Sequence, residues 1–286
     1  MSLGWFVDAL ACFRPCEVAA VPRAAAPDPS SPKGPWQSRG FGNLGSWDIA
    51  FSADYDHRSG YLIDLGYGLR LRVAPDGGEL VVERPDGMSA DDPVVLRSVL
   101  GPGLLLALAL QGSFALHAGA VARGGRAAVF LGDSGAGKST LSAALDRRRA
   151  DGWRRLADDV LPVAPGAEAG IDALPEFPQL KLDAREQYVA DGSSSERLPV
   201  AALYLLEPPA SGEDRVTITT LSPRDAAVAL LTHTVASRLF APDLAARHFA
   251  FCAAAAAAVP VRRLRYPRRL PALDAVAEAL ATDLGI

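Results

Sequence analysis

The sequence is poor in lysine, cysteine and asparagine, and each scarcity narrows what the protein can be. Only three of its 29 basic residues are lysines (Lys33, Lys138 and Lys181), so a lysine kept against this bias indicates that an ammonium group is needed there. Three cysteines are too few for a disulfide framework. Cys12 and Cys16 lack the further neighbouring ligands that a zinc site requires, so we interpret the cysteines as small buried hydrophobes.

The chain also lacks an excess of positive charge and a long apolar run. Its formal net charge is -4, which argues against nucleic acid as a partner. The leucine-rich apolar run 104–110 is far shorter than the ~18 residues that cross a bilayer. The N-terminus has no cationic region before its apolar stretch, and Asp8 interrupts that stretch. We therefore expect a cytoplasmic protein with no membrane partner.

What is present is ordinary globular composition, arranged in three parts. Hydrophobic residues make up 49% and charged residues 22%, which excludes wholesale disorder. Residues 1–35 hold a short apolar stretch and an Ala-, Pro- and Ser-rich run that predicts an arm or linker. Residues 36–102 are predicted to form a small β-rich domain, including a hairpin over 69–83 with a Pro-Asp-Gly-Gly turn. A helix opened by Asp92 and Pro93 and ended by Gly101 closes this part.

Residues 103–286 alternate between helix and strand patterns. Predicted helices cover 103–111, 138–150, 222–231, 242–258 and 271–284, and predicted strands cover 114–122, 127–131, 200–207, 216–221 and 259–266. Such alternation predicts an α/β sheet with helices on its faces. We therefore expect a third domain, of α/β class, over 103–286.

The strongest motif in the chain is Gly-Asp-Ser-Gly-Ala-Gly-Lys-Ser at 132–139, which matches G-x-x-x-x-G-K-[ST]. An apolar strand pattern precedes it and an amphipathic helix pattern follows, as a phosphate-binding loop requires. In such a loop Lys138 reaches the β- and γ-phosphates, and the Ser139 hydroxyl ligates Mg²⁺. The motif predicts ATP as the ligand, bound by Gly132, Asp133, Ser134, Gly135, Ala136, Gly137, Lys138, Ser139 and Thr140.

Other nucleotide-binding classes fit less well. GTPases read guanine with an Asn-Lys-x-Asp element, but the chain's single asparagine, Asn43, lies far upstream. It also has no Ser-Gly-Gly-Gln signature of the kind that ABC-type ATPases carry.

Phosphoryl transfer also needs a carboxylate that holds metal or takes the hydroxyl proton. Asp158-Asp159 follows the stretch 155–157, which we expect to be a strand beside the strand of the 132–139 loop. Both carboxylates would then emerge at the carboxyl edge of the sheet, where ligands bind in such folds. Glu207, at the end of a second apolar strand, is a competing metal-side carboxylate.

The stretches 113–145 and 156–163 resemble the C-terminal catalytic domain of HPr serine kinase/phosphorylase and its kinase-only relatives. The matching motifs are the 132–139 loop, the Ala-Asp-Asp at 157–159, and His117 on the strand before a hairpin. Weaker similarity continues at 178–182, 247–252 and 259–270. The resemblance implies a fold related to phosphoenolpyruvate carboxykinase, ATP and Mg²⁺ as cofactors, and, by analogy, a homo-oligomer.

The resemblance also implies roles for individual residues. Lys138 and Ser139 would bind triphosphate and metal, and His117 would lie near the transferred phosphate. Asp158 and Asp159 would supply the general base and a metal-side carboxylate, with Asp159 a candidate metal ligand and the assignment between them open. The bifunctional members carry glutamate after the loop serine, whereas this chain has Thr140 and no match to their phosphorylase signature. The sequence therefore favours a kinase without phosphorylase activity. It resembles the kinases that tailor lasso peptides more than the sugar-regulatory members of the family.

The acceptor side rests on isolated residues. Lys181, His233, Arg238 and Arg247 are candidates for contact with substrate or phosphate. The run 259–270 carries five arginines, which we interpret as charges on an edge strand or, alternatively, as a surface for an acidic peptide: Arg262, Arg263, Arg265, Arg268 and Arg269.

The leading hypothesis is an ATP- and Mg²⁺-dependent kinase that phosphorylates a hydroxyl, with serine favoured, on a peptide, protein or small molecule. One alternative is a nucleotide-binding scaffold without turnover. A carboxykinase-like lyase is weaker, because no Mn²⁺-ligand set is visible in the sequence.

Overall fold

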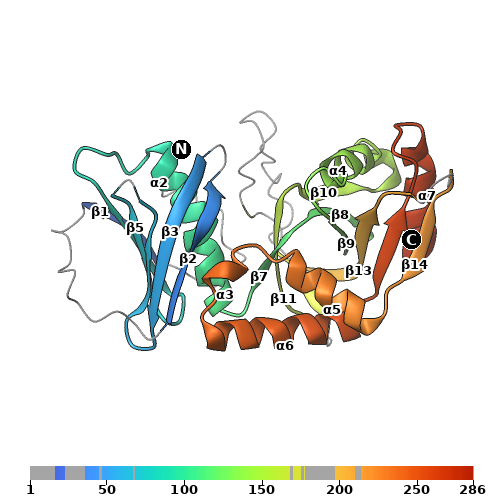
Figure 1. Ribbon diagram of the computed structural model, residues 1–286. Coiled ribbons are helices and arrows are strands. Elements are labelled where there is room, and N and C mark those ends of the chain that lie inside the picture. Colours follow the sequence, from blue (N-terminus) through green and yellow to red (C-terminus); the bar gives the residue numbers. More distant parts are fainter. Residues whose placement is uncertain are drawn as a thin grey trace. The chain divides into compact units, whose positions relative to one another are not determined.

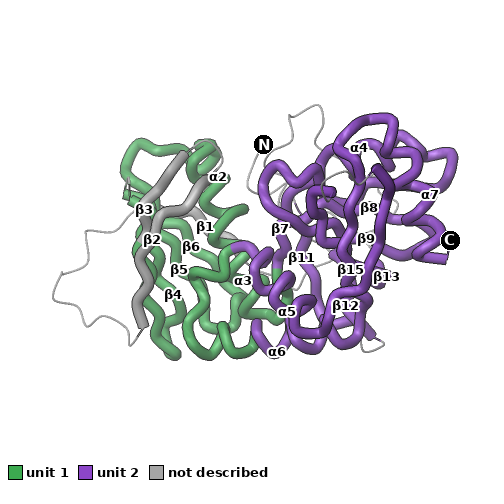
Figure 2. The backbone as a smooth tube through the Cα atoms, turned by 45° about the vertical axis from the view of Figure 1, so that its right-hand side comes forward, with its two compact units in different colours: residues 1–114, 236–247 green, residues 115–235, 248–286 purple. Residues whose placement is uncertain are grey.

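The computed structural model describes residues 17–22, 36–44, 47–66, 68–167, 170–174, 177, 197–209 and 214–285, with side chains from Ser52 onward. These divide into two compact units (Figure 2): residues 1–114 with 236–247, and residues 115–235 with 248–286. The first unit therefore extends to Phe114, whereas the sequence predicts a domain boundary between residues 102 and 103. The segment 236–247 also belongs to unit 1. The short apolar stretch of the N-terminal part, residues 4–13, which the sequence indicates as a short helix, lies outside the described residues.

Unit 1 is built on a six-stranded sheet of order β1-β6-β5-β4-β3-β2, in which only β1 and β6 are parallel. The predicted hairpin is confirmed as β5 and β6, and its turn is closed by the hydrogen bond from Ala74 N to Glu79 O at 2.9 Å. The first strand lies inside the stretch expected to be an arm. The strands are β1 (Glu17–Pro22), β2 (Trp36–Leu44), β3 (Trp47–Asp56), β4 (Gly60–Asp64), β5 (Arg70–Val73) and β6 (Glu79–Arg84).

A helical stretch of unit 1 is strongly apolar but not one straight helix. It comprises α2 (Pro93–Ser98), the π-helical turn η1 (Val99–Gly103) and α3 (Leu104–Leu110). As predicted, Asp92 caps α2, and the helical backbone is broken at Gly101 (φ -80°, ψ -107°). The window Pro93–Leu110 is long and apolar enough to cross a membrane by length and composition, and 67% of it is buried in the structure. Burial of that extent is also what a core helix of a soluble protein shows, so the cytoplasmic assignment stays a prediction.

The segment 236–247 completes unit 1 from far along the chain. It contains the short helix η3 (Ser237–Leu239) and the first turns of α6 (Pro242–Ala258). The buried Tyr61 hydroxyl accepts a hydrogen bond from Ala241 N at 2.9 Å, and the Phe114 and Phe240 rings pack edge to face. These contacts tie the segment to the sheet of unit 1.

Unit 2 is built on a sheet of order β10-β8-β9-β13-β12-β11-β7, with β15 paired to β13 and β14 paired to β15. Its centre consists of β9, β13 and β15, which are parallel to one another. The strands are β7 (Phe114–His117), β8 (Gly119–Arg123), β9 (Arg126–Leu131), β10 (Arg154–Ala157), β11 (Val160–Pro165), β12 (Ile171–Ala173), β13 (Leu198–Glu207), β14 (Thr217–Thr220) and β15 (Val261–Arg265).

Helices cover both faces of this central sheet (Figure 1). α4 (Lys138–Asp146) and α7 (Ala272–Leu284) pack on one face with Phe130, and the short helix η2 (Arg149–Asp151) follows α4. α5 (Pro223–Thr232) and the later part of α6 pack on the other face with Val129. Burial on both sides explains why the pattern before the 132–139 loop is continuously apolar rather than alternating. The predicted α/β class is confirmed.

Two local expectations about the sheet are wrong. The predicted strand 114–122 is interrupted at Ala118, whose N–H binds Asp159 O at 3.1 Å instead of a strand neighbour. β10 pairs with β8 rather than with β9, so one strand separates it from the strand of the 132–139 loop. Because both pairings are antiparallel, β10 and β9 still run in the same direction and end at the same edge of the sheet.

The close approach of α4 to β8 generates a stability prediction. A Cβ on Gly119 would lie 2.5 Å from Ser142 Oγ, and Ser142 is fully buried. Gly119→Ala should therefore destabilise the fold by about 1–3 kcal/mol, measured by urea unfolding.

The companion variant for this test is Ser142→Ala. It removes a buried hydroxyl that has no hydrogen-bond partner among the described residues. Alone it should be neutral or slightly stabilising. Combined with Gly119→Ala it should recover a large part of the loss. Additive effects of the two changes would show that the Ser142 contact is not the cause.

Candidate phosphate-binding site at the carboxyl edge of the unit 2 sheet

The residues 132–139 form a loop that leaves β9 and enters α4, as the motif predicts. Gly132, Gly135 and Gly137 have φ values of +148°, +80° and +93°, which residues with a side chain rarely adopt. A Cβ on Gly132 would lie 2.9 Å from Ala136 Cβ, and one on Gly137 would lie 2.7 Å from Arg268 Nη1. The spacing of the glycines is thus required by backbone conformation and by crowding.

Lys138 is the first residue of α4, and its side chain turns back over the loop. It is 6% exposed, and its Nζ donates hydrogen bonds to Gly132 O at 2.6 Å and to Asp133 O at 3.1 Å. The ammonium group and the first N–H groups of α4 therefore lie at the same loop, an arrangement suited to binding an anion such as phosphate. Ser139 and Thr140 are exposed beside it.

Asp158 and Asp159 follow β10, and one of them is paired with His117. Asp159 Oδ1 lies 3.2 Å from His117 Nε2, with the Asp159 side chain 17% exposed and His117 32% exposed. Asp158 Oδ1 lies 4.0 Å from Arg155 Nη1. The structure therefore places the two neighbouring carboxylates differently, one against an imidazole and one toward a guanidinium.

His233 joins this group through the backbone. His117 N donates a hydrogen bond to His233 O at 2.7 Å, which places the end of α5 beside the turn between β7 and β8. Burial lowers the pKa of His233 below its ordinary value; Asp133 opposes this effect, and Lys138 and His117 add to it. The predicted residues His117, Lys138, Asp159 and His233 thus gather at one edge of the sheet.

A pocket of about 380 Å³ opens beside the loop, between the carboxyl ends of β9 and β13 and one side of α5. His233 and Asp133 belong to its wall, and the His233 carbonyl accepts a hydrogen bond from the backbone N–H of His117, which pairs with Asp159. Its lining residues are Gly132, Asp133, Leu205, Leu206, Glu207, Pro208, Leu221, Asp225, Val228, Ala229, Thr232, His233 and Arg263.

Behind this edge lies a buried polar cluster. His248 Nε2 is 2.8 Å from Thr234 Oγ1 and 3.3 Å from Cys252 Sγ. Burial lowers the pKa of His248 and raises that of the Cys252 thiol to about 12, so this thiol stays protonated. Cys252 is buried, and Cys12 and Cys16, which we interpret as small buried hydrophobes, lie outside the described residues.

The competing carboxylate, Glu207, is already occupied by arginines. Its Oε1 accepts from Arg263 Nε at 2.8 Å, and its Oε2 accepts from Arg265 Nη2 at 2.7 Å. Burial alone would raise the pKa of Glu207, but these hydrogen bonds outweigh burial and hold the pKa below its ordinary value. Both carboxylate oxygens of Glu207 are therefore bound by arginines of β15, which does not favour Glu207 as a metal-side carboxylate.

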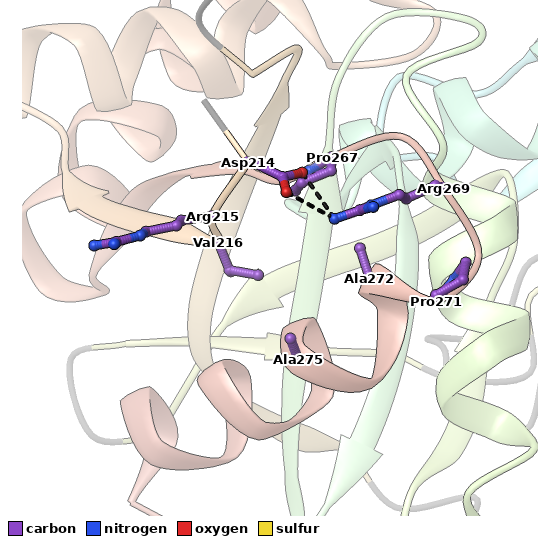
Figure 3. A pocket seen from close by; sticks show the side chains of 8 residues that line it. All are labelled: Asp214, Arg215, Val216, Pro267, Arg269, Pro271, Ala272 and Ala275. Atoms are coloured by element: carbon purple, nitrogen blue, oxygen red, sulfur yellow. Dashed lines mark hydrogen bonds and ion pairs between the residues drawn. The ribbon is translucent and has the colours of Figure 1, made fainter. Parts of the chain in front are cut away.

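The interpretation of the arginine run as charges on an edge strand is wrong. β15 lies between β13 and β14, and its arginines pair across those neighbours and with α7. Arg262 pairs with Asp283 of α7. Arg269 binds Asp214 at 2.8 Å, and both residues line a second pocket of about 450 Å³ (Figure 3). That second pocket contains none of the predicted site residues, and we assign it no ligand.

Arg268 was not singled out from this run, yet it reaches the 132–139 loop. Its Nη1 donates to Ala136 O, and its guanidinium lies over the Tyr266 ring, 5.2 Å from the centroid. Nothing in the local sequence separates Arg268 from the four arginines beside it, so only the fold identifies it.

Three predicted substrate-side residues belong to unit 1 or lie outside the described residues. Lys181 lies outside the described residues. Arg238 and Arg247 belong to unit 1, where Arg247 Nη2 donates to Leu110 O at 2.9 Å. Their roles toward a substrate stay predictions.

Fold and site together define the class: an α/β protein with a glycine-rich, lysine-bearing loop between a central strand and a helix. No protein-family model and no curated protein sequence matches the chain. Among solved structures it is similar to the Hpr(Ser) kinase/phosphatase from Coxiella burnetii, at 11% identity and a TM-score of 0.29. The similarity covers 59% of this chain and 97% of that one, and it is too distant to carry an argument about activity.

The two buried histidines generate a prediction of pH dependence. Both have a folded-state pKa lowered by burial, from an ordinary value of about 6.5. Both therefore contribute stability that is present above pH ~6.5 and is lost as the pH falls through their folded-state pKa. The free energy of unfolding in urea should thus fall below pH ~6.5.

The variant His248→Gln isolates this contribution, since carboxylates also contribute to loss of stability in acid. Its stability should depend less on pH than that of the wild type between pH 7.5 and 5. The control His57→Gln removes a histidine that is 65% exposed and should keep the wild-type slope. Equal slopes in all three proteins would contradict the prediction.

Proposed function

We propose that this protein is an ATP- and Mg²⁺-dependent kinase that transfers the γ-phosphate to a hydroxyl group of a peptide, protein or small molecule, with serine favoured. The observation that carries the proposal is the position of Lys138. Its ammonium lies on the carbonyls of a loop whose glycines adopt positive φ, and the His117–Asp159 pair ends at the same edge of the sheet. This arrangement supports the proposal, because phosphoryl transfer needs a cation for the triphosphate and a carboxylate for the hydroxyl proton.

In the proposed reaction the acceptor oxygen attacks the γ-phosphorus and the bond to the β–γ bridging oxygen breaks. ADP leaves with that electron pair, and the hydroxyl proton passes to a carboxylate of the Asp158–Asp159 pair. Lys138 and the loop N–H groups stabilise the charge on the phosphate oxygens. The His117 imidazole, whose Nε2 lies 3.2 Å from Asp159 Oδ1, orients the Asp159 carboxylate.

The residues present fit magnesium rather than a metal held by protein alone. The described residues contain no group of three or more His, Cys, Asp or Glu side chains that could hold an ion. Mg²⁺ typically takes one or two carboxylates and completes its shell with phosphates and water. Ser139 and a carboxylate of the Asp pair, Asp159 foremost, would hold it, and it would neutralise phosphate charge.

The first test is phosphoryl transfer followed by intact-mass spectrometry. With ATP and Mg²⁺, serine peptides, HPr and hydroxylated metabolites are offered separately as acceptors. A gain of one phosphate on one acceptor is expected, and Lys138→Ala should lower the rate by about 10²-fold or more. ATP binding without transfer to any acceptor would instead favour a nucleotide-binding scaffold.

A second test assigns the base. Asp159→Asn and Asp158→Asn should each be measured for rate and for ATP affinity. Loss of the general base lowers the rate by about 10²–10⁴-fold while ATP affinity is retained. Loss of a metal-side carboxylate also raises the Mg²⁺ concentration that the reaction needs. Wild-type rates in both variants would overturn the role given to the pair.

A further inference from the structure

We propose that the pocket between β13 and α5 binds a peptide acceptor, and that it favours a hydroxyl residue flanked by basic residues over one flanked by acidic residues. This inference rests on the proposed kinase activity and adds to it the place and the charge of the acceptor.

The pocket is placed where an acceptor must lie. Its wall includes Gly132 and Asp133, the first residues of the loop, and His233, whose carbonyl binds the backbone of His117. His117 in turn contacts Asp159 at 3.2 Å. A hydroxyl held in this pocket therefore lies beside the first residues of the loop, and His233 connects the pocket wall through His117 to the Asp158–Asp159 pair. Arg268 lies at the later loop residues, Ala136 and Gly137, on another side of the loop.

The size and the apolar side of the pocket suit a short stretch of peptide. A volume of about 380 Å³ lies in the range of pockets for small ligands or side chains, and it is too small for a folded domain. Val228 lines it and is 52% exposed, one of three large apolar side chains with such exposure among the described residues. An extended peptide can place one side chain inside and pack a neighbour on Val228.

The charges of the lining residues are unequally compensated. Glu207 is paired with two guanidinium groups, those of Arg263 and Arg265, which together carry one more positive charge than Glu207 offsets. Asp225 is hydrogen-bonded to the Ser222 hydroxyl at 2.8 Å, with no cation bound to it among the described residues. The Asp133 carboxylate likewise has no cationic partner within the described part of the chain.

Two other titratable groups border the pocket, and neither compensates these carboxylates. Burial lowers the pKa of His233, which keeps its imidazole neutral at pH 7. Lys138 lies on the loop carbonyls, where the triphosphate is its expected partner. Asp133 and Asp225 carry two negative charges, and the group of Glu207, Arg263 and Arg265 keeps one positive charge, so the pocket stays negative. Negative charge attracts lysine or arginine and repels aspartate or glutamate in a bound peptide.

The experiment uses the whole chain, ATP, Mg²⁺ and an equimolar mixture of two capped pentapeptides, Gly-Lys-Ser-Lys-Gly and Gly-Glu-Ser-Glu-Gly. Mass spectrometry follows the phosphate on each peptide. We expect wild type to phosphorylate the basic peptide at least ~10-fold faster, and added salt to shrink this ratio. Asp225→Lys should bring the ratio to one or invert it.

Asp274→Lys is the matched control. Asp274 is also an acidic residue in the first turn of its helix, α7, and it lies outside the pocket. It should keep the wild-type ratio. If Asp225→Lys fails to fold, Asp225→Asn removes the charge with a smaller change, and the ratio should fall about threefold.

Binding of a non-hydrolysable ATP analogue is measured on the same samples. It distinguishes failure of the proposed acceptor pocket from failure of the proposed kinase activity. Equal rates on the two peptides, preference for the acidic peptide, or a preference that survives both Asp225 variants would overturn the acceptor pocket. Lys138-dependent analogue binding with neither peptide phosphorylated would also overturn it, while leaving the kinase proposal in place. Failure of the wild type to bind the analogue would overturn the proposed function itself.

Discussion

The site depends on a short backbone ladder between two segments that are far apart in the sequence. Val235 N binds Ala115 O at 2.8 Å, His117 N binds His233 O at 2.7 Å, and Leu116 bridges Thr234 between them. The Thr234 hydroxyl is also hydrogen-bonded to the His248 imidazole. Without this ladder the end of α5 would have no fixed position relative to β7. The imidazole of His117 would then lose the backbone that aims it at Asp159.

The parts of the site that follow one another in the sequence could be predicted from it. The strand, glycine loop and helix at 127–146 follow from an apolar run, obligatory glycines and a helix-forming run, all of which are local signals. Asp92 and Ser222 likewise cap α2 and α5, because a side-chain oxygen before an apolar helix pattern has a specific backbone partner. His117 and the Asp pair were placed through resemblance to a family, and the structure places His117 against Asp159.

The parts that depend on strand order could not be read in this way. Local pattern marks 154–157 and 261–265 as strands but does not say which neighbours they choose. β10 therefore turned out to lie beyond β8, and β15 turned out to be interior. The arginines of the run 259–270 look alike in the sequence. Only their partners in space separate Arg263 and Arg265, which bind Glu207, from Arg268, which reaches the loop.

The path of the chain between the units has a consequence for how the protein can be taken apart. The backbone passes from unit 1 to unit 2 after Phe114, returns at Ala236 and leaves again after Arg247, within the single helix α6. No single proteolytic cut can therefore release either unit intact. A gene fragment that began after Phe114 would leave Phe240 and Ala241 without the unit 1 partners that bury them. Natural shuffling of this fold by simple end-to-end fusion is correspondingly restricted, so the two units are expected to be inherited together.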